Sequence, residues 1–589
     1  MGRRLFDTRI VPRAAQLGLS LCLALLAGLF SLLVRGSDYG HNPYHAQQLP
    51  LLERLADPAA YPGDYYVDTA RELPSLLGRA LAALPGGTGA KAFFALHLGS
   101  RLAAFAAFWY LSFSLTGSAA GAALGSLLLA AAPQLHTASP LARDLFFRCQ
   151  FDLSAAAAPF LLLGLAGWFG DGPRLLAGSL ACAAFANPLS ALLLLAACAA
   201  AGLLELAYYK GQGEYARRLG PAVLLAVLAL AVLLARGPEP ELGPALAIWF
   251  PAHYFAGSWS APHLAWGGAS LLLAFAGLRA AAGVFRGGKR LAAFSFGLTG
   301  LWLFYYCASL LLPGTVLLSQ LYRADSLLWL VFLALLGPLA AHAAANGGTL
   351  LLAAAGGLCA VSPLAGPAWL AAAAALLALA AYRPAAALSL PVPAGLAAPL
   401  RTALLAAALT IGLDPWLRTA AERGGFGVPA APAEAEAAGL GAWAAAATKP
   451  ADVFFTPPGE SLRLALRRPV VFEWTDGAAA HWSPGFAAAW LARARDYGVD
   501  PAAAAAWWLA ADRDLYGAWT GPRAETPAAK AFRSMDEDRL AALAEKYGAK
   551  YLVAYAGMPE FRRRFAPRAA GARYRVYELK PAKAGGRRS

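Results

Sequence analysis

The sequence predicts a mainly α-helical fold, a polytopic transmembrane bundle of about thirteen spans followed by a small C-terminal α/β domain. Of its 589 residues, 59% are hydrophobic and only 14% are charged, whereas soluble domains carry about a quarter charged residues. The mean hydropathy of +0.51 also excludes a disordered chain. Residues 1–417 alternate long apolar runs with short polar breaks, and from 418 onward no run is long enough to span a membrane.

The spans follow from the apolar runs, because a membrane-crossing helix needs about 20 such residues. The first predicted span is 14–35. Its apolar run is longer than that of a signal peptide and no A-x-A cleavage site follows it, so we expect it to be retained. The further predicted spans are 91–114, 119–134, 153–170, 175–187, 189–208, 219–236, 264–285, 291–312, 326–343, 348–362, 364–382 and 398–417.

Basic residues give the orientation of these spans, because cytoplasmic loops are enriched in Lys and Arg. Arg3, Arg4 and Arg13 precede the first span, and the loops 209–218 and 286–290 on the same side are also basic. The net charge of +15 therefore indicates orientation, and we predict no nucleic-acid partner. An N-terminus in the cytoplasm and an odd number of spans place the C-terminal domain outside the cytoplasmic membrane.

One outer loop is much longer than the others. Residues 36–90 contain two predicted helices, around 44–56 and 70–83. The first has a stripe of leucines opposite a charged side, which is typical of a helix that lies flat on a membrane. These leucines are Leu49, Leu51, Leu52 and Leu55. A loop of this length that carries many polar and charged residues is typical of a functional segment.

The C-terminal part divides into an Ala/Pro/Gly-rich linker at 418–448, expected to be flexible, an α/β domain at 449–580, and a basic tail at 581–589. Short apolar runs predict strands and the segments between them predict helices. The predicted strands are 469–472, 550–555 and 574–579, and the predicted helices lie near 484–496, 500–511 and 535–547.

Asp38, directly after the first span, is the first candidate site residue. A carboxylate at a membrane edge is partly desolvated, which raises its pKa toward the range of a general base. The alternative is a solvated loop aspartate. His41 and Asp64 lie in the same loop and are candidates for binding an acceptor or a metal ion.

Arginines in two further outer segments are candidates for phosphate binding. Arg143 and Arg148 flank Asp144, so the arginines could bind a phosphate while the carboxylate meets a sugar hydroxyl or a metal ion. The alternative is a local ion-pair cluster. Arg323 lies at the outer edge of the span 326–343, where it could clamp a lipid phosphate or simply extend to the headgroups.

Aromatic residues suggest sugar contacts, with His253 and Trp259 as candidates. The alternative is an interfacial aromatic belt. In the C-terminal domain, the segments 474–477 and 481–482 combine Trp, Asp and His, which is typical of a carbohydrate surface or of a domain that docks on a membrane. The sequence contains no G-x-S-x-G, Walker A or HExxH motif in a credible context, so hydrolase, ATPase and zincin functions have no support.

Taken together, the acidic residue after the first span, the long first loop, the second acidic loop and the C-terminal outer domain resemble the GT-C superfamily of membrane glycosyltransferases. The strip 38–68 and the segment 467–474 are also similar to bacterial GT-C-like membrane proteins of unassigned activity. The resemblance implies an inverting hexosyl or pentosyl transfer from a polyprenyl-phosphate-linked sugar to a lipid, glycan or protein acceptor.

By the same resemblance, Asp38 is the catalytic base, Asp144 helps to bind a metal ion or the acceptor, and Arg323 binds the donor phosphate. The first loop lacks an adjacent D-x-D pair, so a Mg²⁺ or Mn²⁺ ion is only a possible cofactor. Two alternatives remain open, a non-catalytic GT-C-like scaffold in polysaccharide assembly and a transporter. A transporter would carry ionisable residues near the membrane midplane.

Overall fold

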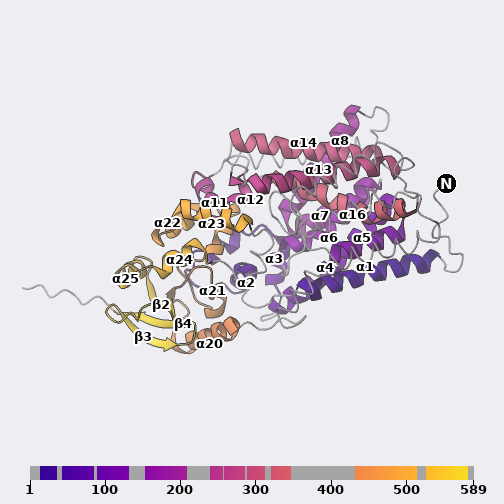
Figure 1. Cartoon of the computed structure of the whole chain (residues 1–589). Coiled ribbons are helices and arrows are strands. Elements are labelled where there is room, and N and C mark those ends of the chain that lie inside the picture. Colours follow the sequence, from indigo (N-terminus) through magenta and orange to yellow (C-terminus); the bar gives the residue numbers. More distant parts are fainter. Residues whose placement is uncertain are drawn as a thin grey trace, which may run out of the picture.

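The computed structural model is mainly helical with one small sheet near the C-terminus, as predicted (Figure 1). It describes residues 13–35, 43–84, 89–131, 153–170, 172–208, 239–255, 258–259, 261–285, 288–311, 320–345, 432–513 and 525–580.

The membrane part is a bundle of long apolar helices, and a helix forms at every predicted span that falls within the described residues. These helices are α1 (Arg13–Arg35), α4 (Gly89–Thr116), α5 (Ala119–Ala131), α6 (Leu153–Phe169), α7 (Pro173–Ala186), α8 (Pro188–Tyr208), α13 (Ala261–Val284), α14 (Gly288–Leu311) and α16 (Ala324–Ala345). In the described part of the chain, 4 segments are long and apolar enough to cross a membrane: 13–32, 188–207, 288–311 and 321–339. The predicted spans 219–236, 348–362, 364–382 and 398–417 lie outside the described residues, so the count of thirteen stays a prediction.

Helix α16 lies at the centre of this bundle, with residues 324–339 buried throughout. It approaches α5 at backbone distance, because Gly121 and Gly125 on α5 face Gly337 on α16. A Cβ atom at Gly337 would lie 2.3 Å from the backbone nitrogen of Gly125 and 2.4 Å from the carbonyl oxygen of Gly121. Small residues four apart permit such close packing of helices in a membrane.

Replacing Gly337 by alanine is therefore expected to push α5 and α16 apart and to destabilise the bundle by about 1–3 kcal/mol, the usual cost of overpacking. Gly300 on α14 is the matched control, since a Cβ there meets nothing within 4 Å. Thermal unfolding of both variants in detergent measures the difference. Equal unfolding midpoints for Gly337→Ala and Gly300→Ala would contradict this packing.

The first outer loop forms α2 (Pro43–Ala56), the 3-10 helix η1 (Val67–Glu72) and α3 (Leu76–Ala82). We expected one helix over 70–83, but the chain leaves η1 at Leu73, where the following Pro74 disfavours helical backbone. We also expected the leucine stripe of α2 to face the membrane. Instead Leu49, Leu51 and Leu52 are buried in one core with the C-terminal domain. An apolar stripe predicts burial, but it does not specify what covers it.

The C-terminal domain contains a four-stranded sheet in the order β1-β2-β4-β3. Its strands are β1 (Val453–Phe455), β2 (Ala549–Tyr555), β3 (Phe565–Ala570) and β4 (Tyr574–Leu579). β1 runs parallel to β2, while β2–β4 and β4–β3 are antiparallel. Two predicted strands are confirmed as β2 and β4. The predicted strand at 469–472 forms only a single bridge, from Val470 to Phe454.

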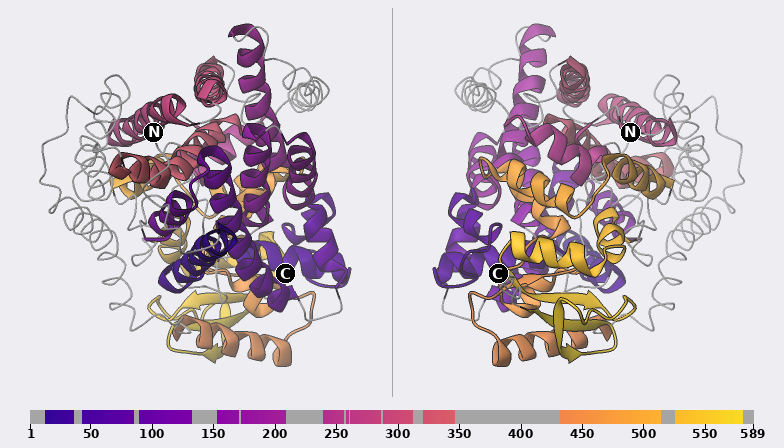
Figure 2. Two further views of the ribbon diagram at one scale, coloured as in Figure 1. Left: turned by 90° about the vertical axis from the view of Figure 1, so that its right-hand side faces the viewer. Right: turned by 90° about the vertical axis from the view of Figure 1, so that its left-hand side faces the viewer.

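The predicted linker differs most from the structure, because residues 432–447 form a helix, α20 (Pro432–Ala447). α20 lies along the sheet at the edge of the molecule, orange against yellow in Figure 2. Its Trp443 packs edge-on against Tyr551 of β2, with ring centroids 5.7 Å apart. The alanine-rich sequence is thus ordered by tertiary packing.

The remaining described helices pack around the sheet, between the sheet and the membrane bundle, or at the end of the bundle. They are α11 (Leu242–Trp249), α12 (Pro251–Tyr254), η5 (Leu321–Arg323), α21 (Leu462–Leu466), η7 (Trp474–His481), α22 (Phe486–Asp496), α23 (Pro501–Arg513), α24 (Pro527–Arg533) and α25 (Glu537–Lys546). Helices α22, α23 and α25 correspond to the three predicted ones. In Figure 1, α2 and α3 lie between the bundle and the C-terminal domain, so the first loop and this domain occupy the same end of the bundle.

Candidate functional site

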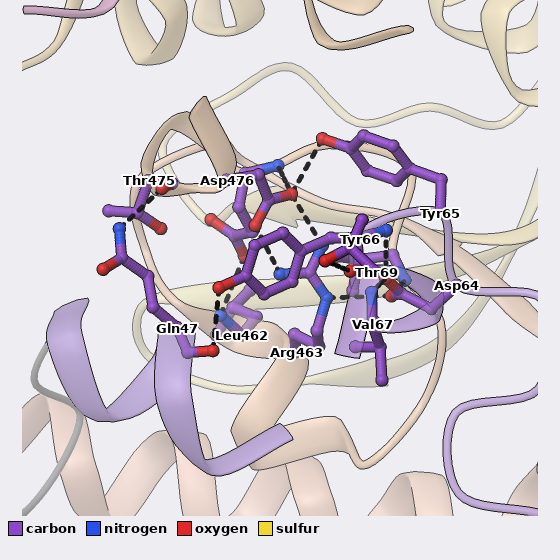
Figure 3. A network of polar contacts seen from close by, with 12 residues as sticks. Gln47, Asp64, Tyr65, Tyr66, Val67, Thr69, Leu462, Arg463, Thr475 and Asp476 are labelled. Carbon is purple, nitrogen blue, oxygen red and sulfur yellow. Dashed lines mark hydrogen bonds and ion pairs between the residues drawn. The ribbon is translucent and has the colours of Figure 1, made fainter. Parts of the chain in front are cut away.

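The first loop is held to the C-terminal domain by a buried polar cluster, which we call the docking network. It consists of Gln47, Asp64, Tyr65, Tyr66, Arg463 and Asp476 (Figure 3). At its centre the guanidinium of Arg463 binds Asp476 through two bonds, of 2.6 and 2.7 Å, and donates from Nε to Asp64 over 2.8 Å. Arg463 and Asp64 are each only 1% exposed.

Further bonds of the docking network cross the same interface. The Tyr65 hydroxyl donates to Asp476 over 2.8 Å, and the Gln47 side chain donates to the carbonyl oxygen of Thr475 over 2.5 Å. The Arg463 guanidinium also lies 4.8 Å from the ring centre of Tyr66. The first loop and the C-terminal domain therefore form one folded unit.

The backbone on both sides of Arg463 is strained. The short helix α21 that carries it is flanked by Ser461 at φ 58° and Arg467 at φ 51°. Left-handed backbone is uncommon for residues other than glycine and persists where the surroundings enforce it. Here the bonds of Arg463 to Asp64 and Asp476 hold α21 in place.

A third carboxyl group, Glu473, adjoins the docking network. Its oxygens accept bonds from the backbone nitrogens of Gly459 and Leu462, both over 3.0 Å. Burial and the neighbouring Asp476 raise the pKa of Glu473 to about 8, against the opposing effect of Arg463. Burial likewise raises the pKa of Asp476 above its ordinary value. The raised pKa favours the protonated form of Glu473, which would limit the negative charge buried around the single guanidinium.

These contacts give Asp64 a structural role. Its Oδ1 accepts bonds from the backbone nitrogens of Tyr66 and Val67, and its Oδ2 accepts from Arg463 and from the backbone nitrogen of Val470. A carboxylate with both oxygens occupied in this way would have to break these bonds to bind a metal ion or an acceptor. Asp64 therefore holds the first loop to the C-terminal domain, and we assign it no ligand.

A second cluster brings together three segments that are distant in sequence, and we call it the tyrosine–histidine cluster. It consists of Tyr254, Tyr305, Tyr322, Arg323 and His481. The Tyr254 hydroxyl lies 2.6 Å from Nε2 of His481, and the Tyr254 and Tyr322 rings meet edge-on with centroids 5.8 Å apart. The Tyr305 hydroxyl donates to the carbonyl oxygen of Tyr254 over 3.2 Å.

Arg323 supplies the positive charge of this cluster. Its Nε donates to the Tyr322 hydroxyl over 3.3 Å, and its guanidinium lies 5.7 Å from the centre of the same ring. Burial, assisted by this guanidinium, lowers the pKa of His481 to about 3. His481 is therefore neutral at physiological pH, and Arg323 is the cation of the cluster.

The element η7 joins the two clusters, because Asp476 belongs to the docking network and His481 to the tyrosine–histidine cluster. The two residues are five positions apart in this 3-10 helix, which corresponds to about 10 Å at a rise of about 2 Å per residue. The predicted carbohydrate surface at 474–482 is thus an interface in which Trp474 is only 5% exposed. A single element of the C-terminal domain connects the first loop to the edge of α16.

The other predicted site residues are only partly described. Trp259 is 7% exposed and stacks on Trp302 with centroids 6.4 Å apart, so it serves packing. His253 belongs to α12, but its neighbour Tyr254 makes the bond to His481. Asp38, His41, Arg143, Asp144 and Arg148 lie outside the described residues. Within the described ranges, no three His, Cys, Asp or Glu side chains come together as metal ligands.

The sequence alone assigns no site role to Arg463, to Tyr254 or to Gln320, the residue before η5. Arg463 had a signal, because an arginine between apolar residues in Leu462–Leu466 indicates a buried cation that needs carboxylate partners. The partners themselves lie far along the chain, Asp64 being 399 residues away.

Comparison with known proteins gives a likeness in structure but none in sequence. No protein-family model matches the chain, and no curated protein matches it. Among solved structures, the chain is similar to the crystal structure of ArnT from Cupriavidus metallidurans bound to undecaprenyl phosphate. The likeness covers 96% of this chain and 98% of that chain, with 14% sequence identity and a TM-score of 0.33. The function is accordingly argued from the residues of this chain.

Proposed function

We propose that this protein is a membrane glycosyltransferase that moves a sugar from a polyprenyl-phosphate donor to an extracytoplasmic lipid, glycan or protein acceptor. The observation that carries this proposal is the linkage through η7. It joins the loop that follows the first membrane helix to the arginine at the edge of α16. An acidic loop segment and a cationic cluster thus belong to one folded unit at one end of an apolar bundle.

The docking network also supports the proposed topology. Because the first loop and the C-terminal domain share one core, they lie on the same side of the membrane. The basic N-terminus favours a cytoplasmic start for α1. One crossing by α1 then puts both the loop and the domain outside, and the total number of spans is odd whatever its exact value.

In the proposed reaction, Asp38 removes the proton from an acceptor hydroxyl, which attacks the anomeric carbon of the donor sugar with inversion. The bond between that carbon and the phosphate oxygen breaks, and polyprenyl phosphate leaves. Arg323 stabilises the negative charge on the departing phosphate. Asp38 lies in the segment that joins α1 to α2, the helix docked on η7 through Gln47.

Asp144 and His41 remain proposed contacts to the acceptor or a metal ion, and Arg143 and Arg148 remain proposed phosphate ligands. His253 and Trp259 stay secondary proposals for the sugar, since Trp259 is engaged in packing.

The test is Arg323→Gln in the full chain, reconstituted in nanodiscs with a panel of undecaprenyl-phosphate-linked sugars and an extract of envelope acceptors. Release of undecaprenyl phosphate is expected to fall about 10²–10³-fold, the usual effect of losing one group that stabilises developing charge. The matched control is Arg279→Gln, an exposed arginine on α13 that lies over Phe296. Equal release from Arg323→Gln and the control would remove Arg323 from the reaction.

A further inference from the structure

Two buried polar atoms near Arg323 have no hydrogen-bond partner among the described residues. They are Nδ1 of His481 and Oε1 of Gln320. Leaving a buried donor or acceptor unpaired costs about 1–3 kcal/mol, and native folds satisfy most of these groups. Two such atoms beside one cationic cluster indicate positions that a ligand completes.

The hydrogen bond to Tyr254 defines what His481 can offer such a ligand. When the tyrosine hydroxyl donates to Nε2, the neutral ring carries its proton on Nδ1. The ring is also held in place, with centroids 4.9 Å from Tyr254 and 6.1 Å from Trp249. Trp249 in turn packs on Gly477, because a Cβ atom at Gly477 would lie only 2.6 Å from Cγ of Trp249. His481 therefore presents a fixed N–H donor.

Gln320 offers the complementary group, an unpaired carbonyl acceptor. Its side chain is buried, at 6% exposure, and its backbone adopts φ 48° and ψ 25°. Left-handed backbone in a residue other than glycine is a strain that clusters at ligand sites. The carbonyl oxygen of Gln320 also accepts a bond from the backbone nitrogen of Arg323 over 3.1 Å, which fixes the start of η5.

A donor, an acceptor, a cation and aromatic side chains together match a hydroxyl-rich ring attached to a phosphate. We propose that His481 and Gln320 hydrogen-bond the sugar hydroxyls of the lipid-linked donor while Arg323 binds its phosphate. The C-terminal domain thus supplies part of the sugar selectivity of a site in the membrane domain. This inference rests on the proposed function for the identity of the donor, but it concerns binding and does not require turnover.

The experiment compares two kinds of lipid on the full chain in nanodiscs. The first is undecaprenyl phosphate without a sugar, and the second is undecaprenyl phosphate that carries glucose or arabinose. His481→Gln keeps an acceptor at the position of Nε2, and so the bond to Tyr254, but it lacks the Nδ1 donor. His481→Asn places an amide N–H near the position of Nδ1. Gln320→Asn retains a residue that tolerates left-handed backbone but shortens the side chain.

His481→Gln and Gln320→Asn are expected to weaken binding of the better sugar-bearing lipid about three- to tenfold, the effect of one lost hydrogen bond. Their affinity for undecaprenyl phosphate should not change, and His481→Asn should recover part of the loss. Equal losses for both lipids, or no loss for the sugar-bearing ones, would overturn the assignment. So would a wild-type protein that binds neither sugar-bearing lipid more tightly than undecaprenyl phosphate.

The same samples separate this inference from the proposed function. Sugar-dependent binding without release of undecaprenyl phosphate would reject glycosyl transfer and leave the binding site standing. Release that persists unchanged in His481→Gln, together with unchanged binding, would reject the binding site and leave transfer standing.

Discussion

Arg463→Met is expected to destabilise the docked first loop and C-terminal domain by about 3–5 kcal/mol, the usual effect of breaking a buried ion pair from one side. The methionine fills much of the space of the arginine stem but leaves Asp64 and Asp476 without their shared cation. Asp476 loses two bonds of 2.6 and 2.7 Å in an environment where it is fully buried.

The matched control is Arg467→Met, since Arg467 also joins the C-terminal domain to the first loop. It binds Glu53 over 2.6 Å, but its side chain is 69% exposed. Exposed pairs contribute at most about 1 kcal/mol, so this variant should stay close to wild type. Thermal unfolding in detergent and limited proteolysis of residues 43–84 measure both variants. The docking network would lose its assigned role if Arg463→Met proved as stable and as protease-resistant as Arg467→Met.

Asp38→Asn is expected to reduce glycosyl transfer about 10²–10⁴-fold, the usual contribution of a general base. The amide cannot accept the proton of the acceptor hydroxyl, yet it is nearly the same size as the carboxylate. Binding of undecaprenyl phosphate should therefore stay within about threefold of wild type, since phosphate affinity is assigned to Arg323.

Asp57→Asn in the same loop is the control for the loss of an acidic charge. Asp57 is exposed and accepts a bond from the backbone nitrogen of Ala59 through Oδ1, which an asparagine oxygen can replace. Initial rates of undecaprenyl phosphate release and lipid binding are measured for both variants. Similar rates in Asp38→Asn and Asp57→Asn would exclude Asp38 as the base.

The membrane helices could be predicted from the sequence because their apolar runs are local properties of the chain. The same holds for α22 and α25, whose apolar periodicity lies within single segments. α20 could not be predicted, since its alanine-rich sequence is also that of a flexible linker. Its order depends on Trp443 meeting Tyr551, a contact between segments more than a hundred residues apart in sequence.

Only part of the candidate site could be predicted, because its contacts also join segments that are distant in sequence. The sequence indicates the segments 474–477 and 481–482 and the residue Arg323 separately, but their composition does not show that η7 and η5 meet through Tyr254. Asp64 is a predicted ligand because it shares the long outer loop with Asp38 and His41. Its actual environment is set by Arg463 and by the backbone of Val470, both in the C-terminal domain.

The most direct test of the central claim is the release of undecaprenyl phosphate by the wild-type protein in nanodiscs. It is measured by mass spectrometry with a panel of undecaprenyl-phosphate-linked hexoses and pentoses and an extract of envelope acceptors. The account predicts release from at least one donor. The transferred sugar should be recovered on an acceptor, with its anomeric configuration inverted relative to the donor. Binding of these lipids with no release from any of them would contradict glycosyl transfer and favour a non-catalytic scaffold.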